Sequence, residues 1–139
     1  MGITLTISPT LKTSLQNMVA NANIHLVYTG VNDACFQSKA QEKDYILYFG
    51  RLDIHTKGLD ILFKAMKKLT AKNIRLVLAG KSTPDREHTL REMANTLGIS
   101  QHIEFFGQVS EEERSLLMSE ALFVCMPSRY EGWGIVAIE

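Results

Sequence analysis

The stretch Pro127-Ser128-Arg129-Tyr130-Glu131-Gly132-Trp133-Gly134-Ile135-Val136-Ala137-Ile138-Glu139 follows a short apolar run, residues 121–126, that is typical of a buried parallel strand. Gly132 and Gly134 predict a turn around a tryptophan, and the small and apolar residues after them predict the start of a helix. A strand that leads through such a turn into a helix places backbone N–H groups at the positive end of the helix dipole. Because α/β sheets bind anions at such places, we expect a phosphate here.

The length and composition of the chain indicate one soluble globular domain over residues 1–139. With 45% apolar and 22% charged residues, its 139 residues suffice for a hydrophobic core. Fifteen basic and fifteen acidic side chains cancel, so no net charge favours nucleic acid or a membrane. The sequence has no apolar run of about 20 residues and no N-terminal signal pattern. Cys35 and Cys125 suggest no disulfide framework, so we expect a cytoplasmic location.

From residue 44 onward, strand and helix patterns alternate along the sequence. The predicted strands cover residues 45–49, 74–79, 102–106 and 121–126, and helices are predicted at 58–72, from Pro84 to Leu97, after Ser110 and after Gly134. A strand at 3–7 and a helix from Ser8 to about residue 20 extend the same pattern, and a second strand is predicted at 24–27. Such alternation predicts an α/β fold with a parallel sheet, helices on both of its faces and right-handed crossovers.

Glycines follow the predicted strands at their carboxyl ends. Gly50, Gly80 and Gly107 end three of them, and the turn at 132–134 follows the fourth. Ligands of such sheets bind beyond the carboxyl ends of the strands. We therefore expect one edge of the sheet to hold the binding site.

Arg51 and Lys57 lie on the loop that follows the strand at 45–49. The planar fork of an arginine and the point charge of a lysine would together suit a diphosphate. The alternative is that each is a surface charge or pairs with a helix end.

Two carboxylates, Glu131 and Glu139, enclose the glycine-rich turn. One precedes the predicted helix and the other lies about two turns along it, so we expect them to serve opposite ends of an extended ligand rather than to act as an acid/base pair on one bond. A carboxylate at this edge can accept hydrogen bonds from vicinal hydroxyls, as on ribose. The alternative for Glu139 is a fraying chain end. Trp133 either stacks on a ligand or packs beside the helix start.

The remaining polar residues indicate no further chemistry. The histidines and cysteines show no metal-ligand spacing, so no metal is expected. His55 lies on the same loop as Arg51 and is interpreted as a bystander rather than a base. Lys64, Lys67 and Lys68 lie off the apolar stripe of the predicted helix, and we interpret them as a solvated face rather than a binding patch.

Several of these motifs together resemble a known family. They are Gly50-Arg51-Leu52, Lys57-Gly58-Leu59-Asp60, Leu78-Ala79-Gly80, Phe106-Gly107, and Pro127-Ser128 through Glu131-Gly132-Trp133-Gly134 to Glu139. In this order they resemble the C-terminal half of retaining glycosyltransferases of family four. Those enzymes have the GT-B fold, in which two Rossmann-like domains enclose the active site. The segment around Ser8 and Gly30-Val31-Asn32 resembles the end of the N-terminal half and the crossover, so that residues 1–43 are assigned to this part.

The resemblance implies a role for each matching residue. Arg51 and Lys57 would hold the donor diphosphate, Glu131 the hydroxyls of the donor sugar, and Glu139 the ribose. The amides of Gly132, Trp133 and Gly134 would touch sugar and phosphate. The binding residues would also include Gly50 and Gly80, and the turn from Gly107 to Val109 would receive the base. Such enzymes generally need no metal or cofactor, and their donor is a nucleoside-diphosphate sugar.

The resemblance also implies partners and a limit. The family continues beyond the position of Glu139 and has a preceding domain that binds the acceptor, a glycan or a lipid. The isolated chain is therefore expected to be inactive, its exposed sheet edge would allow oligomers, and the full-length enzyme would be able to associate peripherally with a membrane. Two alternatives stay open: a non-catalytic nucleotide or nucleotide-sugar module, and a structural fragment that binds nothing.

Overall fold

The computed structural model describes residues 2–31 and 41–139, which fall into two compact units. The first unit combines Met1–Asn32 with Glu131–Glu139, and the second is Asp33–Tyr130. Asn32 and Cys35 lie outside the described residues. The N-terminal strands pair with each other and do not extend the main sheet. The prediction of one domain over residues 1–139 stays a prediction. The assignment of residues 1–43 to the end of a preceding half stays a prediction.

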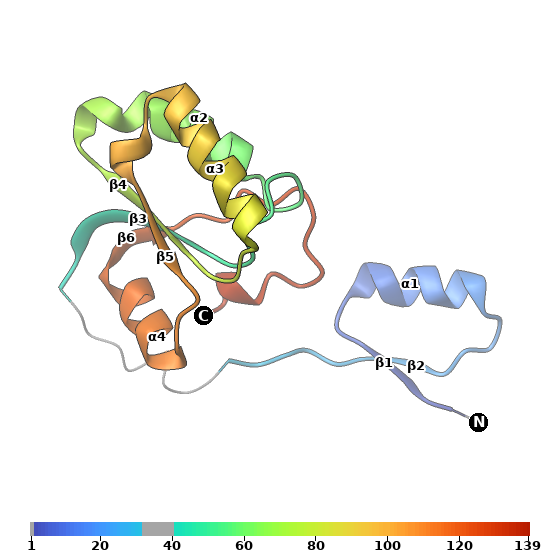
Figure 1. Ribbon diagram of the computed structural model, residues 1–139. Helices are drawn as coiled ribbons and strands as arrows, with labels where there is room; N and C mark the ends of the chain where they lie inside the picture. The colour runs from blue at the N-terminus through green and yellow to red at the C-terminus, as the bar shows by residue number, and fades with distance from the viewer. Residues whose placement is uncertain (1, 32–40) are drawn as a thin grey trace. The chain divides into compact units, whose positions relative to one another are not determined.

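The second unit contains a parallel sheet with the strand order β5-β4-β3-β6 (Figure 1). Its strands are β3 (Lys43–Phe49), β4 (Arg75–Ala79), β5 (Ile103–Gly107) and β6 (Ala121–Val124). The helices are α2 (Leu59–Leu69) with the 3-10 turn η2 (Thr70–Lys72), α3 (Pro84–Leu97) with η3 (Ser100–His102) after it, and α4 (Glu111–Glu120). The predicted α/β fold with helices on both faces of a parallel sheet is confirmed.

The path of the chain through this sheet reverses at β3. From β3 it moves outward through β4 to β5, and it then returns through α4 to β6 on the other side of β3. In open α/β sheets such a reversal leaves a crevice beyond the carboxyl ends of the two strands that flank it. The topology therefore predicts a crevice beyond the ends of β3 and β6.

Each face of the sheet has its own apolar core. Helices α2 and α3 cover one face, where Tyr48 of β3 packs with Phe63 and Leu90, and α4 covers the other face, where Leu47 packs with Leu117 (Figure 1). Alternate residues of β3 therefore point into different cores, which explains why its sequence is continuously apolar.

The helix ends follow the sequence signals. Pro84 opens α3, and Gly98 in the left-handed region ends it. The Oγ of Ser110 accepts a hydrogen bond from the backbone N–H of Glu113, whose side chain accepts from the backbone N–H of Ser110, so the predicted capping box is confirmed.

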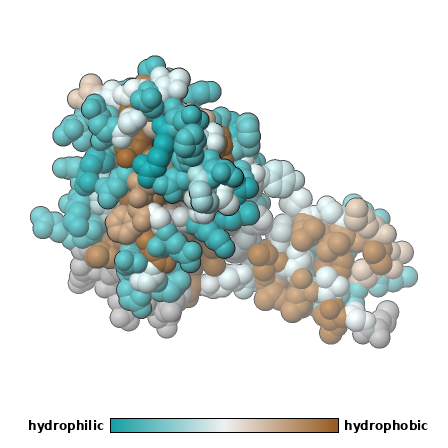
Figure 2. All heavy atoms as spheres, viewed as in Figure 1, coloured by the Kyte–Doolittle hydropathy of each residue, from teal (hydrophilic) through white to brown (hydrophobic). Residues whose placement is uncertain are grey.

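The first unit contains a small parallel sheet of its own. Strands β1 (Thr4–Thr6) and β2 (Ile24–Leu26) are hydrogen-bonded to each other in parallel. The helix α1 (Pro9–Met18) connects them, and the side chain of Ser8 caps its N-terminus. Many of its apolar side chains are exposed, and Figure 2 shows them gathered on this unit. After Gly134 the predicted helix is only the 3-10 turn η4 (Ile135–Ala137). No helix in the described part of the chain has the length and apolar character that a bilayer crossing requires.

The close approach of two loops makes Gly58 sensitive to substitution. Gly58 precedes α2 and Gly98 follows α3, and their φ angles are nearly equal at +67° and +70°. A β-carbon at Gly58 would lie 2.1 Å from the carbonyl oxygen of Pro127, whereas one at Gly98 would meet nothing within 4 Å.

We therefore expect Gly58→Ala to lower the free energy of unfolding by about 2–4 kcal/mol, from left-handed strain plus overpacking. Gly98→Ala is the matched control and should lose about 1 kcal/mol, from the strain alone. Urea unfolding of both variants measures the difference. Equal losses would mean that the two loops do not touch in solution.

Candidate functional site

The strand ends that carry Gly50, Gly80 and Gly107 lie side by side. The N–H of Gly50 donates to the carbonyl of Ala79 (3.0 Å), and the N–H of Gly80 donates to that of Gly107 (2.7 Å). A β-carbon at Gly80 would lie 2.1 Å from the carbonyl oxygen of Gly50. The absence of side chains thus lets the ends of β3, β4 and β5 stay closely packed.

The loop after β3 is held by contacts of its backbone. The carbonyl of Arg51 accepts hydrogen bonds from the Tyr48 hydroxyl (2.7 Å) and from the N–H of Asp53 (2.8 Å). The side chain of Leu52 is buried and anchors the loop in the core. Residue 51 is exposed, so its side chain starts from a fixed backbone at the surface.

A carboxylate organises the rest of this loop. One oxygen of Asp53 accepts from the N–H of Thr56 (2.8 Å), and this hydrogen bond is the main reason why the pKa of Asp53 lies below its ordinary value. Arg86 of α3 approaches the same carboxylate at 3.6 Å. The N–H of Lys57 donates to the carbonyl of Asp53 (3.2 Å), and Lys57 is half-buried. Two guanidinium groups, those of Arg86 and Arg51, thus act electrostatically on the carboxylate of Asp53.

The loop after β6 lies against the loop after β3. The backbone N–H groups of Arg129 and Tyr130 both donate to the carbonyl of Thr56, at 3.0 and 3.3 Å. The guanidinium of Arg129 donates to both carboxylate oxygens of Asp60, at 2.7 and 2.8 Å, and to the carbonyl of His55 at 2.9 Å. The hydrogen bonds from Arg129 lower the pKa of Asp60 to about 2. The chain is thus fixed up to the residue that precedes Glu131.

The glycine-rich turn belongs to the first unit. Glu131 and Gly132 are exposed, while Gly134 has a left-handed backbone and precedes η4. The ring of Trp133 lies 5.4 Å from that of Tyr28, an observation that favours packing over ligand stacking. Its indole nitrogen meets no acceptor among the described residues.

The glycine-rich turn does not lead into the helix that the sequence predicts. We predicted a helix with Glu139 about two turns along it, but η4 has three residues and Glu139 follows it almost at once. A turn this short has little summed dipole, so it does not by itself provide an anion site.

The predicted site residues fall into two groups. Arg51, Lys57 and the glycines at 50, 80 and 107 meet at the carboxyl edge of the second unit, where Val109 packs into the smaller core with Leu117. Glu131, Gly132, Trp133, Gly134 and Glu139 belong to the first unit, which is described separately.

Sequence analysis missed the roles of Asp60, Arg129 and Arg86. Asp60 and Arg129 are 69 positions apart, so no local pattern links them. The usable signal was that Asp60 and Arg129 follow β3 and β6, two strands that the topology makes neighbours.

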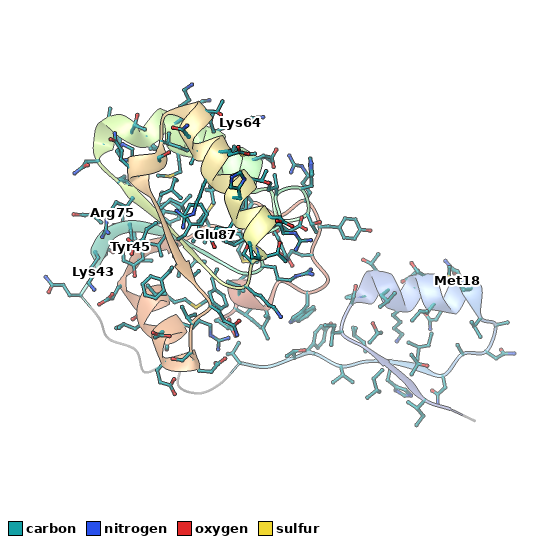
Figure 3. All side chains as sticks on the ribbon, in the orientation of Figure 1. Met18, Lys43, Tyr45, Lys64, Arg75 and Glu87 are labelled. Atoms are coloured by element: carbon teal, nitrogen blue, oxygen red, sulfur yellow. The ribbon has the colours of Figure 1, made fainter. Side chains whose placement is uncertain are left out.

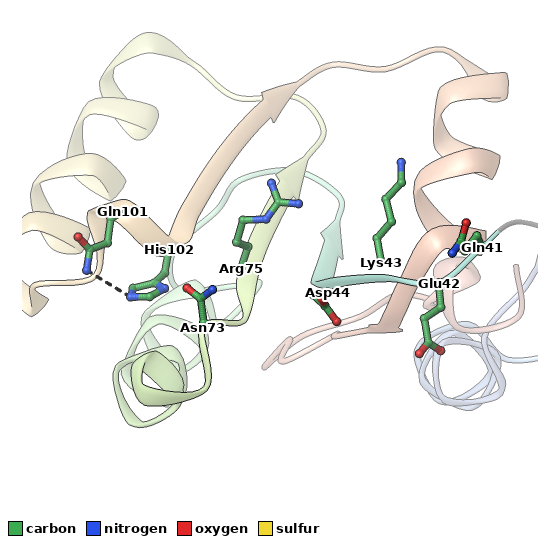
Figure 4. Close-up of a pocket in the computed structure, with 8 residues that line it drawn as sticks. All are labelled: Gln41, Glu42, Lys43, Asp44, Asn73, Arg75, Gln101 and His102. Atoms are coloured by element: carbon green, nitrogen blue, oxygen red, sulfur yellow. Dashed lines mark hydrogen bonds between the residues drawn. The ribbon is translucent and has the colours of Figure 1, made fainter.

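An open hollow lies at the opposite edge of the sheet. It measures about 880 Å³ and is lined by Gln41, Glu42, Lys43, Asp44, Asn73, Arg75, Gln101 and His102 (Figure 4). Figure 3 labels Lys43, Tyr45 and Arg75 at this amino edge, and Lys64 on the exposed side of α2. Lys43 pairs with Glu120 (2.6 Å) and Arg75 with Glu104 (2.9 Å). The two cations Lys43 and Arg75 of this hollow are thus each paired with a carboxylate. Among residues 2–31 and 41–139, no group of histidine, cysteine, aspartate and glutamate side chains is arranged to hold a metal ion.

Comparisons with known proteins all match this chain to glycosyltransferases. A family model described as glycosyl transferases group 1 matches residues 32–139. An uncharacterised glycosyltransferase of Methanocaldococcus jannaschii is 35% identical over 99 residues, which cover 70% of this chain and 25% of the relative. A GDP-mannose:cellobiosyl-diphosphopolyprenol alpha-mannosyltransferase of Komagataeibacter xylinus is 31% identical over 125 residues, or 87% of this chain and 32% of the relative.

A solved structure supports the fold. The crystal structure of WaaG, a glycosyltransferase involved in lipopolysaccharide biosynthesis, superposes with a TM-score of 0.78 at 19% identity, covering 96% of this chain and 40% of that one. The chain therefore spans a quarter to two fifths of the length of these proteins. The family match covers most of the chain and includes the loops after β3 and β6. The resemblance is thus confirmed: this chain belongs to the group 1 glycosyl transferases.

Proposed function

We propose that this chain binds the donor in a retaining, metal-independent glycosyltransferase that moves a sugar from a nucleoside diphosphate to an acceptor. The observation that carries the proposal is the position of Arg51 and Lys57. Both lie on the loop after β3, at the switch point of the sheet, where α/β folds bind nucleotides.

Charge and geometry suit this edge to a diphosphate. The carboxylate of Asp53 accepts from the N–H of Thr56 and feels the positive charges of both Arg86 and Arg51, so these two guanidinium groups carry more charge than the one carboxylate. The backbone contacts of Arg51 and Lys57 fix where their side chains begin. When the sugar leaves, negative charge grows on the diphosphate, and fixed cations stabilise that charge without reorganisation.

The remaining roles follow from the family pattern. Glu131 would accept hydrogen bonds from hydroxyls of the donor sugar, and the amides of Gly132, Trp133 and Gly134 would contact sugar and phosphate. Glu139 would hold the ribose, and the turn from Gly107 to Val109 would receive the base through backbone groups. The indole N–H of Trp133 is a further donor available to a ligand.

The relatives support a sugar nucleotide as donor. The name of the Komagataeibacter relative specifies GDP-mannose and a diphosphopolyprenol acceptor. Since this chain spans 32% of that relative, the acceptor would bind to residues outside it. We expect the isolated chain to bind a nucleoside diphosphate without transferring a sugar, and detectable transfer or sugar-nucleotide hydrolysis would show that it carries more of the active site.

Replacing either cation tests the phosphate site. Arg51→Ala and Lys57→Ala should each weaken the binding of UDP or GDP by about 1–3 kcal/mol, because each removes a charge-assisted hydrogen bond. Isothermal titration calorimetry measures the affinity, and the thermal unfolding midpoint should change little.

The matched controls are Lys67→Ala and Lys68→Ala on the exposed side of α2, which should leave the affinity unchanged. Parental affinity in both Arg51→Ala and Lys57→Ala would show that the phosphate site has been misassigned.

A further inference from the structure

We propose that Asp60 and Arg129 are positioning residues, an ion pair that clamps the loop after β6 onto the loop after β3 and so holds Lys57 in place for a diphosphate. This inference rests on the proposed function. Neither side chain needs to touch the ligand, because both act through Lys57.

The pair has the geometry of a specific contact. The guanidinium of Arg129 donates to both oxygens of the Asp60 carboxylate and uses a third hydrogen bond for the carbonyl of His55. The side chain of Asp60 is 18% exposed, so solvent screens its carboxylate less than that of an ordinary surface pair. A bidentate pair of this kind fixes orientation as well as distance.

The residues directly before and after Lys57 in the sequence both contact the loop after β6. Before it, the carbonyl of Thr56 accepts from the N–H groups of Arg129 and Tyr130. After it, Gly58 leaves no room for a β-carbon beside the carbonyl of Pro127. Asp60 follows in the first turn of α2. If the ion pair is loosened, the β6 loop loses its side-chain anchor, and Lys57 loses the surface against which its backbone is held.

The ion pair of Glu87 with Arg91 cannot act in this way. Glu87 and Arg91 form a pair at 2.6 Å, but they lie one turn apart on α3 and join no separate segments. Such pairs contribute little beyond local helix stability. Arg91 therefore provides a matched control for changes at Arg129.

The clamp has to exist in solution for this inference to hold. An NMR titration of the Asp60 carboxyl carbon should give a pKa of about 2, against an ordinary value of 3.8. Because the folded-state pKa is lowered, the stabilisation from the pair is complete above pH 4 and is lost as the pH falls through about 2. A pKa near 3.8 in the folded parent would overturn the proposal.

The decisive experiment measures affinity for UDP and GDP by calorimetry in the 139-residue chain. Arg129→Lys keeps the charge but loses the fork, and Asp60→Asn keeps the shape but loses the charge. Each should weaken binding about tenfold. In a Lys57→Ala background the same changes should cost less than twofold, because the residue through which they act is gone. Arg91→Lys should change nothing.

The outcomes separate this inference from the function on which it rests. Parental affinity in both Arg129→Lys and Asp60→Asn would overturn the positioning role alone. A tenfold loss that persists in the Lys57→Ala background would also overturn it, because the pair would then act through overall stability. A folded parent that binds neither nucleotide would overturn the proposed function and this inference together.

Discussion

The structure depends on the parallel pairing of β3 with β4 on one side and β6 on the other. Phe49 pairs with Ala79, and Leu47 pairs with Val124, so the three strands end at the same edge. Since β6 comes last in the chain, its return to β3 brings residues more than 70 positions apart to neighbouring strand ends. Arg51 and Lys57 leave one of these ends, and the segment that leads to Glu131 leaves the other.

Several further contacts turn this alignment of strand ends into two fixed loops. The N–H of Cys125 still donates to the carbonyl of Leu47 (2.7 Å), so the pairing continues just past the end of β6. Beyond it, Arg129 and Tyr130 share the carbonyl of Thr56, and Arg129 binds Asp60. Glycine matters where backbones meet, as at Gly58 and Gly80, since a β-carbon there would lie 2.1 Å from a carbonyl oxygen. Cationic side chains can then be held at this edge of the sheet without being buried. Burying these charges would cost free energy.

Much of this fold is encoded locally, and those parts could be predicted. The period of apolar residues predicts α2, the continuous apolar run predicts β3, and the capping residues place the ends of α3 and α4. What sequence patterns do not contain is which strands pair. Nothing local assigns β6 to the side of β3 opposite β4, or gives β1 and β2 a sheet of their own. The pair of Asp60 and Arg129 is hidden for the same reason, because it exists only after β6 has found its place. For the segment after Gly134 the local pattern is misleading: its composition predicts a helix, but the structure has only a 3-10 turn there.

The central claim is that the carboxyl ends of β3 and β6 form the nucleotide-binding edge. An NMR titration of the ¹⁵N-labelled chain with UDP and GDP tests it most directly. The account predicts amide shifts concentrated at residues 50–58 and 125–130. Shifts confined to the hollow at the amino edge, around Lys43, Asn73 and His102, with none at the loops after β3 and β6, would contradict it.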